Sequence, residues 1–277
     1  MTRRRLDAEL VRRGLATSRT EARSAVRDGL VRIGGRVAEK PSTLVQPAEP
    51  VELVGPTRRF VSRGGEKLDA ALDRFRVDPA GRECLDVGAS TGGFTDCLLH
   101  RGAAHVVAVD VGYGQLAWSL RSDPRVTALD RTNARDLGPE DLPFAPSLIV
   151  SDLSFISSTL VVAALARVAA TSADLVLLVK PQFEAGRKDV GRGGVVRDTA
   201  AWRRVIERVI EACEASGLTP VGVMPSPLRG PAGNVEFPLH AIRGPASGRP
   251  DVDAAIAEGA RIGGGPMTGA RVIGGTS

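Results

Sequence analysis

The sequence predicts an α/β protein in which a doubly wound, mostly parallel sheet follows a small N-terminal α+β domain. From residue 82 onward, short apolar runs alternate with helix-like segments, the pattern of repeated β-α units. Residues 1–60 hold 13 Lys and Arg against 7 Asp and Glu, whereas the remaining residues hold 24 against 25. The net charge of +5 is therefore confined to the N-terminal part, which predicts a polyanion-binding module joined to a nearly neutral domain.

The amino-acid composition disfavours several other classes of protein. Aromatic residues make up only 4% of the 277 residues, which disfavours a protein built on base-stacking platforms. Cys84, Cys97 and Cys213 have no metal-ligand spacing, so we expect reduced core thiols of a cytoplasmic protein and no metal site. The basic start lacks the apolar stretch of a signal peptide, and two charged residues interrupt the longest apolar region, residues 159–179. We therefore expect no membrane as primary partner and see no sign of an obligate protein partner.

The basic N-terminal part predicts two helices and a hairpin. A first apolar stripe ends at Gly14, and a second helix follows with alanines and a valine on one side. Arg19, Arg23 and Arg27 lie three or four residues apart on its other side. The segment VRIGGRV predicts a hairpin with Gly34-Gly35 at its turn. An ordinary solvated charged face is the alternative interpretation.

This order of elements resembles the alpha-L RNA-binding domain over about residues 4–55. The resemblance implies structured RNA held mainly through phosphates. The candidate RNA-binding residues are Arg4, Arg5, Arg12, Arg19, Arg23, Arg27, Arg63 and Lys188. Lys188 lies in the glycine-rich segment 184–198, which suits either a mobile RNA-contacting lid or an ordinary loop.

The larger domain shows six strand-like segments. The first is followed by a glycine-rich turn and a helix within residues 82–102, and the others lie in 104–112, 146–155, 174–180, 218–227 and 235–242. Parallel strands of such a sheet bind ligands beyond their carboxyl ends, so residues at those ends are site candidates.

The first candidate is the turn DVGASTGGF, residues 86–94. Asp86 places a carboxylate where a cationic aminoacyl group could bind, and Asp110 ends the next strand, where an acid can accept hydrogen bonds from ribose hydroxyls. The spacing favours S-adenosyl-L-methionine, with a nicotinamide cofactor or a purely structural turn as alternatives. The candidate cofactor-binding residues are Asp86, Gly88, Ala89, Ser90, Thr91, Gly92, Gly93, Asp110, Val111, Asn133, Asp152 and Phe155. Phe155 could stack on the cofactor or a target base, or pack in the core.

The second candidate is Lys180, which follows the apolar run LVLLV. An ammonium at a buried strand end is costly unless it is paired or neutral. Asp152 ends an earlier strand, Glu236 begins a later one, and Lys67 lies on the helix before the first strand. Each of these charges alone could be a surface group or a structural ion pair.

Together the four follow the Lys-Asp-Lys-Glu order of the RrmJ/FtsJ group of ribose 2′-O-methyltransferases. The segments SRGGEKLDAAL, LDVGASTGGFTD, DVGYGQLAW, DLSFIS, VKPQFE, VGRGGVV and GNVEF resemble the TlyA family over nearly the full chain. That resemblance implies a Rossmann-like class I methyltransferase that modifies cytidines of bacterial 16S and 23S ribosomal RNA. The proline-rich stretch before residue 58 and the glycine-rich end of the chain predict the domain boundaries. We expect residues 1–57 as the RNA-binding domain, 58–61 as a linker, 62–245 as the methyltransferase and 246–277 as a largely flexible tail with a short helix at 251–260.

The resemblance also implies roles for the four residues. Lys180 would accept the proton of the 2′-hydroxyl, and the positive charge of Lys67 would favour the neutral form of that amine. Asp152 and Glu236 would orient the lysines and the hydroxyl. A membrane-active haemolysin, a label that the family has carried, and a non-catalytic RNA-binding assembly factor are the alternative functions.

Overall fold

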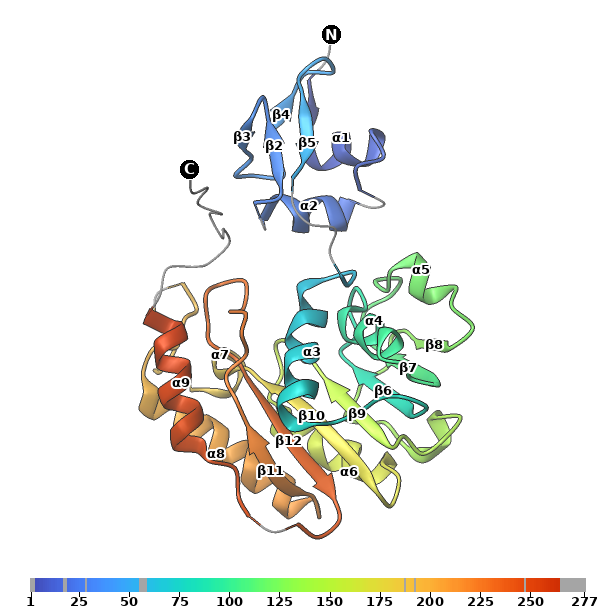
Figure 1. Ribbon diagram of the computed structural model, residues 1–277, viewed down its shortest axis with the longest axis vertical. Coiled ribbons are helices and arrows are strands. Elements are labelled where there is room, and N and C mark those ends of the chain that lie inside the picture. The colour runs from blue at the N-terminus through green and yellow to red at the C-terminus, as the bar shows by residue number, and fades with distance from the viewer. Residues whose placement is uncertain are drawn as a thin grey trace, which may run out of the picture. The chain divides into compact units, whose positions relative to one another are not determined.

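The computed structural model describes residues 3–16, 19–27, 29–54, 59–186, 188–191, 193–246 and 248–264. The chain forms two compact units, which are described separately; the first ends at Arg58 and the second spans Arg59–Pro266. Figure 1 shows a small α+β unit at the N-terminus and a larger unit with one central sheet.

The described residues of the first unit form two short sheets and two helices. Its elements are β1 Arg4–Arg5, α1 Leu6–Arg12, α2 Arg19–Arg27, β2 Val31–Ile33, β3 Arg36–Val37, β4 Leu44–Val45 and β5 Val51–Leu53. Strands β1 and β4 form one sheet, and β3-β2-β5 form the other. The predicted hairpin is confirmed, because β2 pairs antiparallel with β3 and both Gly34 and Gly35 have positive φ angles. Leu6, Leu10 and Val31 lie at the centre of a small core.

The second unit is built on a seven-stranded sheet of order β11-β12-β10-β9-β6-β7-β8. Its strands are β6 Glu83–Val87, β7 His105–Val109, β8 Val126–Leu129, β9 Leu148–Ser151, β10 Ala173–Val179, β11 Thr219–Val223 and β12 Phe237–Arg243. The pairs β10-β9, β9-β6, β6-β7 and β7-β8 are parallel, whereas β12 runs antiparallel between β10 and β11. The predicted doubly wound, mostly parallel sheet is therefore confirmed.

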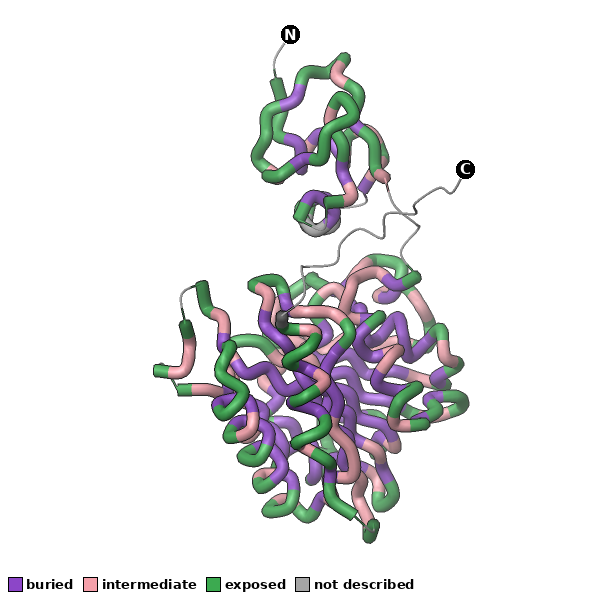
Figure 2. Tube along the Cα trace, turned by 60° about the vertical axis from the view of Figure 1, so that its left-hand side comes forward, coloured by how far each residue is buried: buried purple, intermediate pink, exposed green. Residues whose placement is uncertain are grey.

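Helices cover both faces of this sheet. They are α3 Arg63–Phe75, α4 Gly93–His100, α5 Trp118–Arg121, α6 Val162–Val168, α7 Pro181–Glu184, α8 Thr199–Ala215 and α9 Val252–Gly264, with 3₁₀ turns η1 Pro139–Asp141 and η2 Ser158–Leu160. Helices α3 and α4 pack on the face formed by alternate strand residues such as Cys84 and Val150, whereas α6 and α8 pack on the face formed by Leu85 and Ile149. Figure 2 shows the resulting buried interior of the larger unit.

All three cysteines are free and buried, as the sequence predicted. Burial raises the pKa of the Cys84, Cys97 and Cys213 thiols to about 12, so these groups stay protonated at neutral pH. In the part of the chain that the structure describes, no helix is long and apolar enough to cross a membrane.

The structure differs from the expected domain boundaries in two places. Residues 59–61 were expected in a linker, but Phe60 is buried, Arg59 contacts Asp69 at 2.5 Å, and the Val61 amide donates to Asp96 at 2.7 Å. These contacts tie the segment to α3 and α4. The expected flexible tail contains α9, which buries Ile256 in the core of the second unit. The helix is longer than expected, and residues 265–277 lie outside the described part of the chain.

Candidate active site

The carboxyl ends of three adjacent parallel strands carry the main candidate residues. From β6 the chain proceeds to β7 and β8 on one side, then crosses to β9 and β10 on the other. Such a reversal leaves a crevice at the strand ends, where ligands of doubly wound folds bind. Asp86 lies in β6, Asp152 follows β9, and Lys180 follows β10. The sequence thus placed these three residues at the correct edge of the sheet.

Lys180 is held between two polar groups of the segment that follows β9. Its Nζ lies 2.5 Å from Asp152 Oδ1 and donates to Ser154 Oγ at 3.1 Å. The side chain is buried, and the ring of Phe183 lies 5.8 Å from the ammonium. The question raised by a lysine at an apolar strand end has a structural answer, since an acid on the neighbouring strand compensates its charge.

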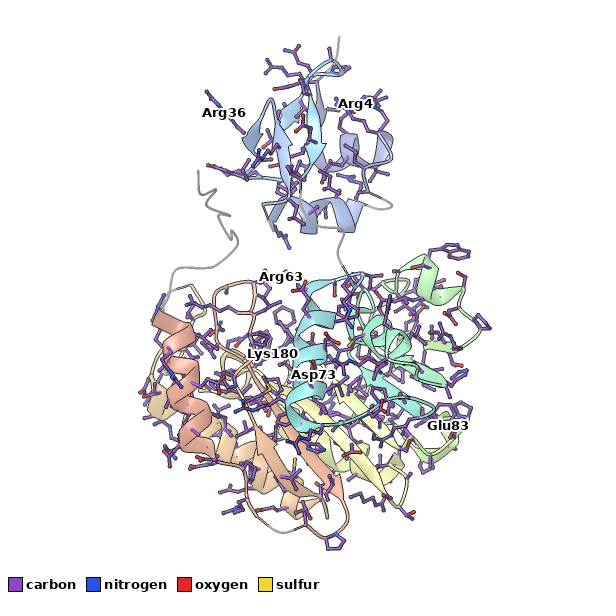
Figure 3. All side chains as sticks on the ribbon, in the orientation of Figure 1. Arg4, Arg36, Arg63, Asp73, Glu83 and Lys180 are labelled. Atoms are coloured by element: carbon purple, nitrogen blue, oxygen red, sulfur yellow. The ribbon has the colours of Figure 1, made fainter. Side chains whose placement is uncertain are left out.

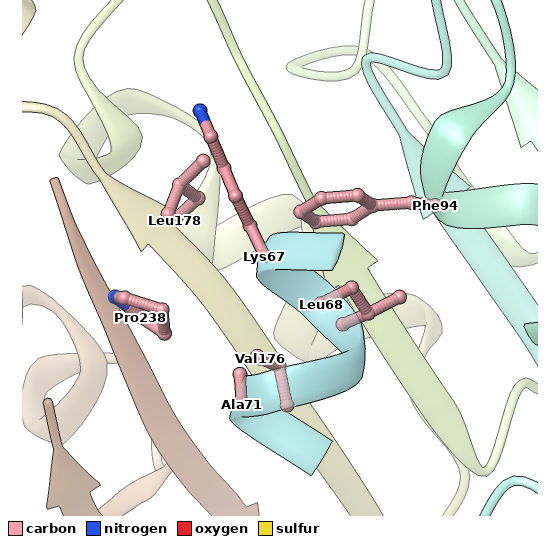
Figure 4. A pocket seen from close by; sticks show the side chains of 7 residues that line it. All are labelled: Lys67, Leu68, Ala71, Phe94, Val176, Leu178 and Pro238. Atoms are coloured by element: carbon pink, nitrogen blue, oxygen red, sulfur yellow. The ribbon is translucent and has the colours of Figure 1, made fainter. Parts of the chain in front are cut away.

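Lys67 and Glu236 form a second buried pair. Lys67 Nζ lies 2.5 Å from Glu236 Oε2, while Gln182 Nε2 donates to Glu236 Oε1 at 3.2 Å. Figure 4 shows the Lys67 side chain leaving α3 beside an apolar crevice and its ammonium extending away from it. That crevice is too narrow for a water molecule and is lined by Leu68, Ala71, Phe94, Val176, Leu178 and Pro238. Gln182 lies two residues after Lys180, so α7 links the two pairs.

The pairing bears on the roles first expected. Glu236 was expected to help orient the lysines, and in the structure it pairs with Lys67, whose positive charge was expected to act on Lys180. Each lysine of the set has its own carboxylate, which gives two separate ion pairs.

The glycine-rich turn passes close to the end of β9. Gly88 has a φ of +84°, and a Cβ atom there would lie 2.8 Å from the carbonyl oxygen of Asp152. Only glycine fits this conformation and this spacing without a backbone shift. Asp110 fixes the turn from the other side, because it accepts the Ser90 amide at 2.8 Å and the Gly112 amide at 2.6 Å. The turn and the catalytic candidate Asp152 are therefore packed against each other.

Asp86 is completely buried behind this turn. Its Oδ2 accepts the amide of Thr95 at 2.8 Å and the Thr95 hydroxyl at 2.6 Å, which fixes the first turn of α4. Burial raises the pKa of Asp86 to about 7, and the nearby charge of Asp152 adds to this rise. Its Oδ1 is buried without a hydrogen-bond partner among the described residues. An unsatisfied carboxylate oxygen beside a glycine cradle fits a ligand that brings a cation or an N–H group.

The remaining cofactor candidates are more exposed. Val111 is exposed just beyond β7, and Asn133 accepts the Arg135 amide at 3.2 Å. Phe155 is 90% exposed, has a φ of +65°, and lies 5.0 Å from the Phe183 ring. The core-packing alternative for Phe155 is therefore wrong. A bulky residue with positive φ is strained, which marks a position fixed by its surroundings.

Sequence reasoning missed four polar residues that hold the site. Ser154 and Gln182 contact members of the two pairs directly. Glu184 is buried and accepts from the Ser157 hydroxyl and from the Ser158 amide at 2.6 Å, so α7 holds the segment that carries Phe155. These residues lie in the segments DLSFIS and VKPQFE, shortly after Asp152 and Lys180. Their closeness in sequence to those two candidates could have identified them as parts of the site.

The fourth missed residue, Asn234, bears on the expected mobile lid. It accepts the Val196 amide at 2.9 Å and donates to the Gly194 carbonyl at 2.9 Å, and Trp202 donates to the Val196 carbonyl at 2.9 Å. The carboxyl-terminal part of segment 184–198 is thus anchored. Lys188 is exposed, and Arg187 and Arg192 lie outside the described residues.

The arginines of the first unit surround two buried acids. Asp7 contacts Arg5, Arg19 and Arg23, and Glu9 contacts Arg12 and Arg13. The sequence predicted the arginine side of α2 but not these acids. Arg4 and Arg27 are exposed, and Arg63 is the first residue of α3 (Figure 3).

Comparisons with known proteins agree with this architecture. A family model described as FtsJ-like methyltransferase matches residues 60–243, and one described as S4 domain matches residues 4–51. The fold and these two matches define an FtsJ-like methyltransferase with an N-terminal S4 domain. A solved S-adenosylmethionine-dependent methyltransferase from Listeria monocytogenes shares the fold, with a TM-score of 0.50 and 18% identity over 66% of this chain and all of that one.

Two relatives are much more similar. The 16S/23S rRNA (cytidine-2′-O)-methyltransferase TlyA of Mycobacterium tuberculosis is 55% identical over 85% of this chain and 88% of its own. A solved structure described as a hemolysin from Streptococcus thermophilus is 37% identical, with a TM-score of 0.75 over 95% of this chain and 97% of that one. The chain belongs to the TlyA family of methyltransferases.

Proposed function

We propose that this protein transfers the methyl group of S-adenosyl-L-methionine to the ribose 2′-hydroxyl of cytidines in 16S and 23S ribosomal RNA. The observation that carries the proposal is Lys180, a buried lysine at a parallel-strand end, paired with Asp152, whose backbone lies against the glycine-rich turn. The name of the Mycobacterium tuberculosis relative supports the substrate. Acting on ribosomal RNA would place the enzyme in the cytoplasm, with ribosomal subunits as partners.

The residues at the turn fit the cofactor. A Cβ atom on Gly88, Gly92 or Gly93 would collide with neighbouring protein atoms, so these glycines allow the turn its tight conformation. Asp86 offers its unsatisfied Oδ1 to a ligand. Asp110 closes the turn and lies where ribose hydroxyls of a nucleoside would be accepted. Ala89, Ser90 and Thr91 complete the turn, with Val111, Asn133 and Phe155 as further contacts. When bound, S-adenosylmethionine supplies a methyl group on a sulfonium, which is already a strong electrophile.

The four charged residues of the two ion pairs supply the rest of the chemistry. A ribose hydroxyl is a weak nucleophile, so the protein must align it and take its proton. Lys180 Nζ is the group that takes this proton, which requires that its ammonium first releases a proton of its own, and Asp152 and Ser154 hold the nitrogen in place. Glu236, fixed by Lys67 and Gln182, orients the nucleotide. No step needs a covalent enzyme intermediate.

The arginine-rich first unit supports the RNA substrate. Guanidinium groups pair with phosphate oxygens in a bidentate manner, and such contacts supply affinity with little sequence selection. The choice of cytidine would then be made at the site in the second unit, where the exposed ring of Phe155 could stack on the target base.

The test is to map 2′-O-methyl groups in ribosomal RNA incubated with the protein and labelled cofactor. We expect label on ribose of cytidines in both rRNAs, and none with the Lys180→Ala variant. Label on one rRNA alone would restrict the substrate, and label on a base would refute ribose chemistry. Leakage of liposomes by protein that fails to methylate either rRNA would favour the membrane-active alternative.

A further inference from the structure

Of the two buried acids of the first unit, Asp7 is the one that connects α1 to α2. Asp7 has no exposed surface, yet it is surrounded by three arginine side chains that are 46–52% exposed. Arg5 precedes α1, whereas Arg19 and Arg23 lie on α2. A single carboxylate therefore collects three cations from two elements at the surface.

The contacts fix the direction of each guanidinium. Arg5 donates through Nε and Nη2 to the two oxygens of Asp7, both at 3.1 Å. Arg23 donates through Nε at 3.0 Å, and Arg19 donates through Nη2 at 3.2 and 3.3 Å. A guanidinium has five N–H donors, and the contacts of Arg5 with Asp7 use two of them. The arginines keep donors and exposed surface for a second anion.

The charges of the cluster do not cancel. Three guanidiniums and one carboxylate leave a local charge of +2, and hydrogen bonds from Arg5 hold the pKa of Asp7 well below its usual range, with Arg23 and Arg19 adding to the effect. The carboxylate stays charged throughout the physiological range. It gives the arginines an anchor, but it does not neutralise the surface they form.

We propose that Asp7 is a positioning residue that pre-organises Arg5, Arg19 and Arg23 as a phosphate-binding surface for RNA. The inference rests on the proposed function, because it takes RNA as the ligand of this unit. Ordering a long side chain on binding is costly, and an anchor that orders it in the free protein removes that cost. A buried acid thereby strengthens binding to a polyanion although its own charge opposes it.

Neutralising Asp7 should strengthen RNA binding through charge but weaken it through lost anchoring of the arginines. Because these two effects on affinity have opposite signs, the proposal can be tested. Asp7→Asn raises the net charge of the protein by one, as does Glu39→Gln, which alters an exposed acid with no ion pair to any residue that the structure describes. In the full chain, we expect Asp7→Asn to weaken binding to a large-subunit rRNA transcript about tenfold, and Glu39→Gln to leave it unchanged or slightly tighter. Equal or tighter binding by Asp7→Asn would overturn the proposal.

A coupling measurement separates positioning from a general loss of structure. The Arg5→Gln, Arg19→Gln and Arg23→Gln changes are combined, and Asp7→Asn is then added to that protein. Because Asp7 acts through these arginines, we expect little further loss of affinity in the combined background. A further tenfold loss there would show that Asp7 supports the fold alone. If the three arginine changes leave the affinity for RNA unaltered, the proposal that this unit binds the RNA is wrong as well.

A third measurement uses the unaltered protein and so does not depend on the folding of any variant. Arg5 and Arg23 donate to Asp7 through Nε, whereas Arg36 is an exposed arginine of the same unit. We expect the Nε–H protons of Arg5 and Arg23 to exchange with solvent at least about tenfold more slowly than that of Arg36 in the absence of RNA. Equal exchange rates would mean that no pre-organisation exists.

Discussion

The two units use buried charge in opposite arrangements. In the first unit, the acids Asp7 and Glu9 are buried and most of their arginine partners reach solvent. In the second unit, Lys67, Lys180 and Glu236 are all buried. The first arrangement presents cations outward, where they can meet an external anion. The second arrangement keeps its lysines inside, where each is compensated by a carboxylate.

The type of cationic side chain in each unit matches the function proposed for that unit. Arginine stays protonated and forms a rigid fork, which suits phosphate recognition at a surface. Lysine has one small donor group and can lose its proton when desolvated, which suits proton transfer in a buried site. A chain that binds RNA in one unit and acts on it in the other would need both kinds of cation. The predictions below test this division, beginning with the largest effect.

Replacing Lys180 should have the largest effect on catalysis. With both substrates saturating, Lys180→Ala and Lys180→Arg should lower the single-turnover rate of methyl transfer at least about 1000-fold, because neither side chain can accept the proton. Lys40→Ala, which alters an exposed lysine, is the matched control. Near-normal turnover in Lys180→Arg would reduce Lys180 to a positioning role.

Removing the first unit should affect RNA affinity and leave cofactor affinity unchanged. A chain that begins at Arg59 retains the contacts of Arg59 and Val61 with α3 and α4. We expect it to bind rRNA about 100-fold more weakly than the full chain at low salt, with a shallower dependence on salt. Filter binding across a salt series and calorimetry with the cofactor measure the two affinities. Undiminished RNA binding would move the docking surface to the second unit.

Asp86→Ala should weaken cofactor binding about tenfold, because a buried carboxylate that would contact the ligand is lost. The wild-type affinity should rise as the pH increases through about 7, where Asp86 becomes charged. Calorimetry at several pH values measures both effects, with Asp86→Asn as the pH-independent control. Equal affinity in Asp86→Ala and wild type would contradict the role assigned to this carboxylate.

The same group predicts the pH dependence of stability. The pKa of Asp86 is raised in the native protein, so between about 4 and 7 the native state binds a proton that the unfolded chain has released. This contribution to stability is present at low pH and is lost as the pH rises through about 7. Thermal unfolding of the ligand-free protein should show a smaller decline over this window in Asp86→Asn than in wild type.

Glu184 should give the smallest effect. Glu184→Ala removes the acceptor for Ser157 and Ser158 and loosens the segment that carries Phe155, so we expect turnover to fall about threefold to fivefold. Glu184→Gln keeps an acceptor for the Ser158 amide and should retain most of the activity. Separate values of kcat and KM for the two variants distinguish positioning of the target, which lowers kcat, from binding, which raises KM. Identical loss in both would show that the charge matters and not the hydrogen bonds.

Much of this architecture was predictable because strand ends are visible in the sequence. Apolar runs that end in Asp86, Asp152 and Lys180 mark carboxyl ends of parallel strands, and those ends meet at one edge. The polar partners were not predictable in the same way. Asp7 lies beside the apolar stripe of α1, and its burial depends on arginines of α2 that pack over it. The periodicity of one helix shows which of its residues face inward, but it does not show which residues of another helix contact them.

The pairing within the second unit shows the same limit. The sequence identified Lys67 and Glu236, but their 169-residue separation along the chain gives no indication that they bind each other rather than Lys180 and Asp152. That partnership follows from β12, which lies antiparallel beside β10 and brings its preceding residue under α3. Strand order in a mixed sheet is a property of the whole domain.

The position of β12 also has a consequence for how the protein is made. It inserts between β10 and β11, so the sheet has a gap beside β10 until residues 237–243 have been synthesised. The first unit, by contrast, contains all its strands within the first 54 residues and can fold early during translation. A nascent chain therefore acquires its arginine surface long before Glu236 reaches Lys67. The ability to transfer a methyl group should therefore be acquired last during synthesis. Premature termination should yield a protein that binds RNA without modifying it.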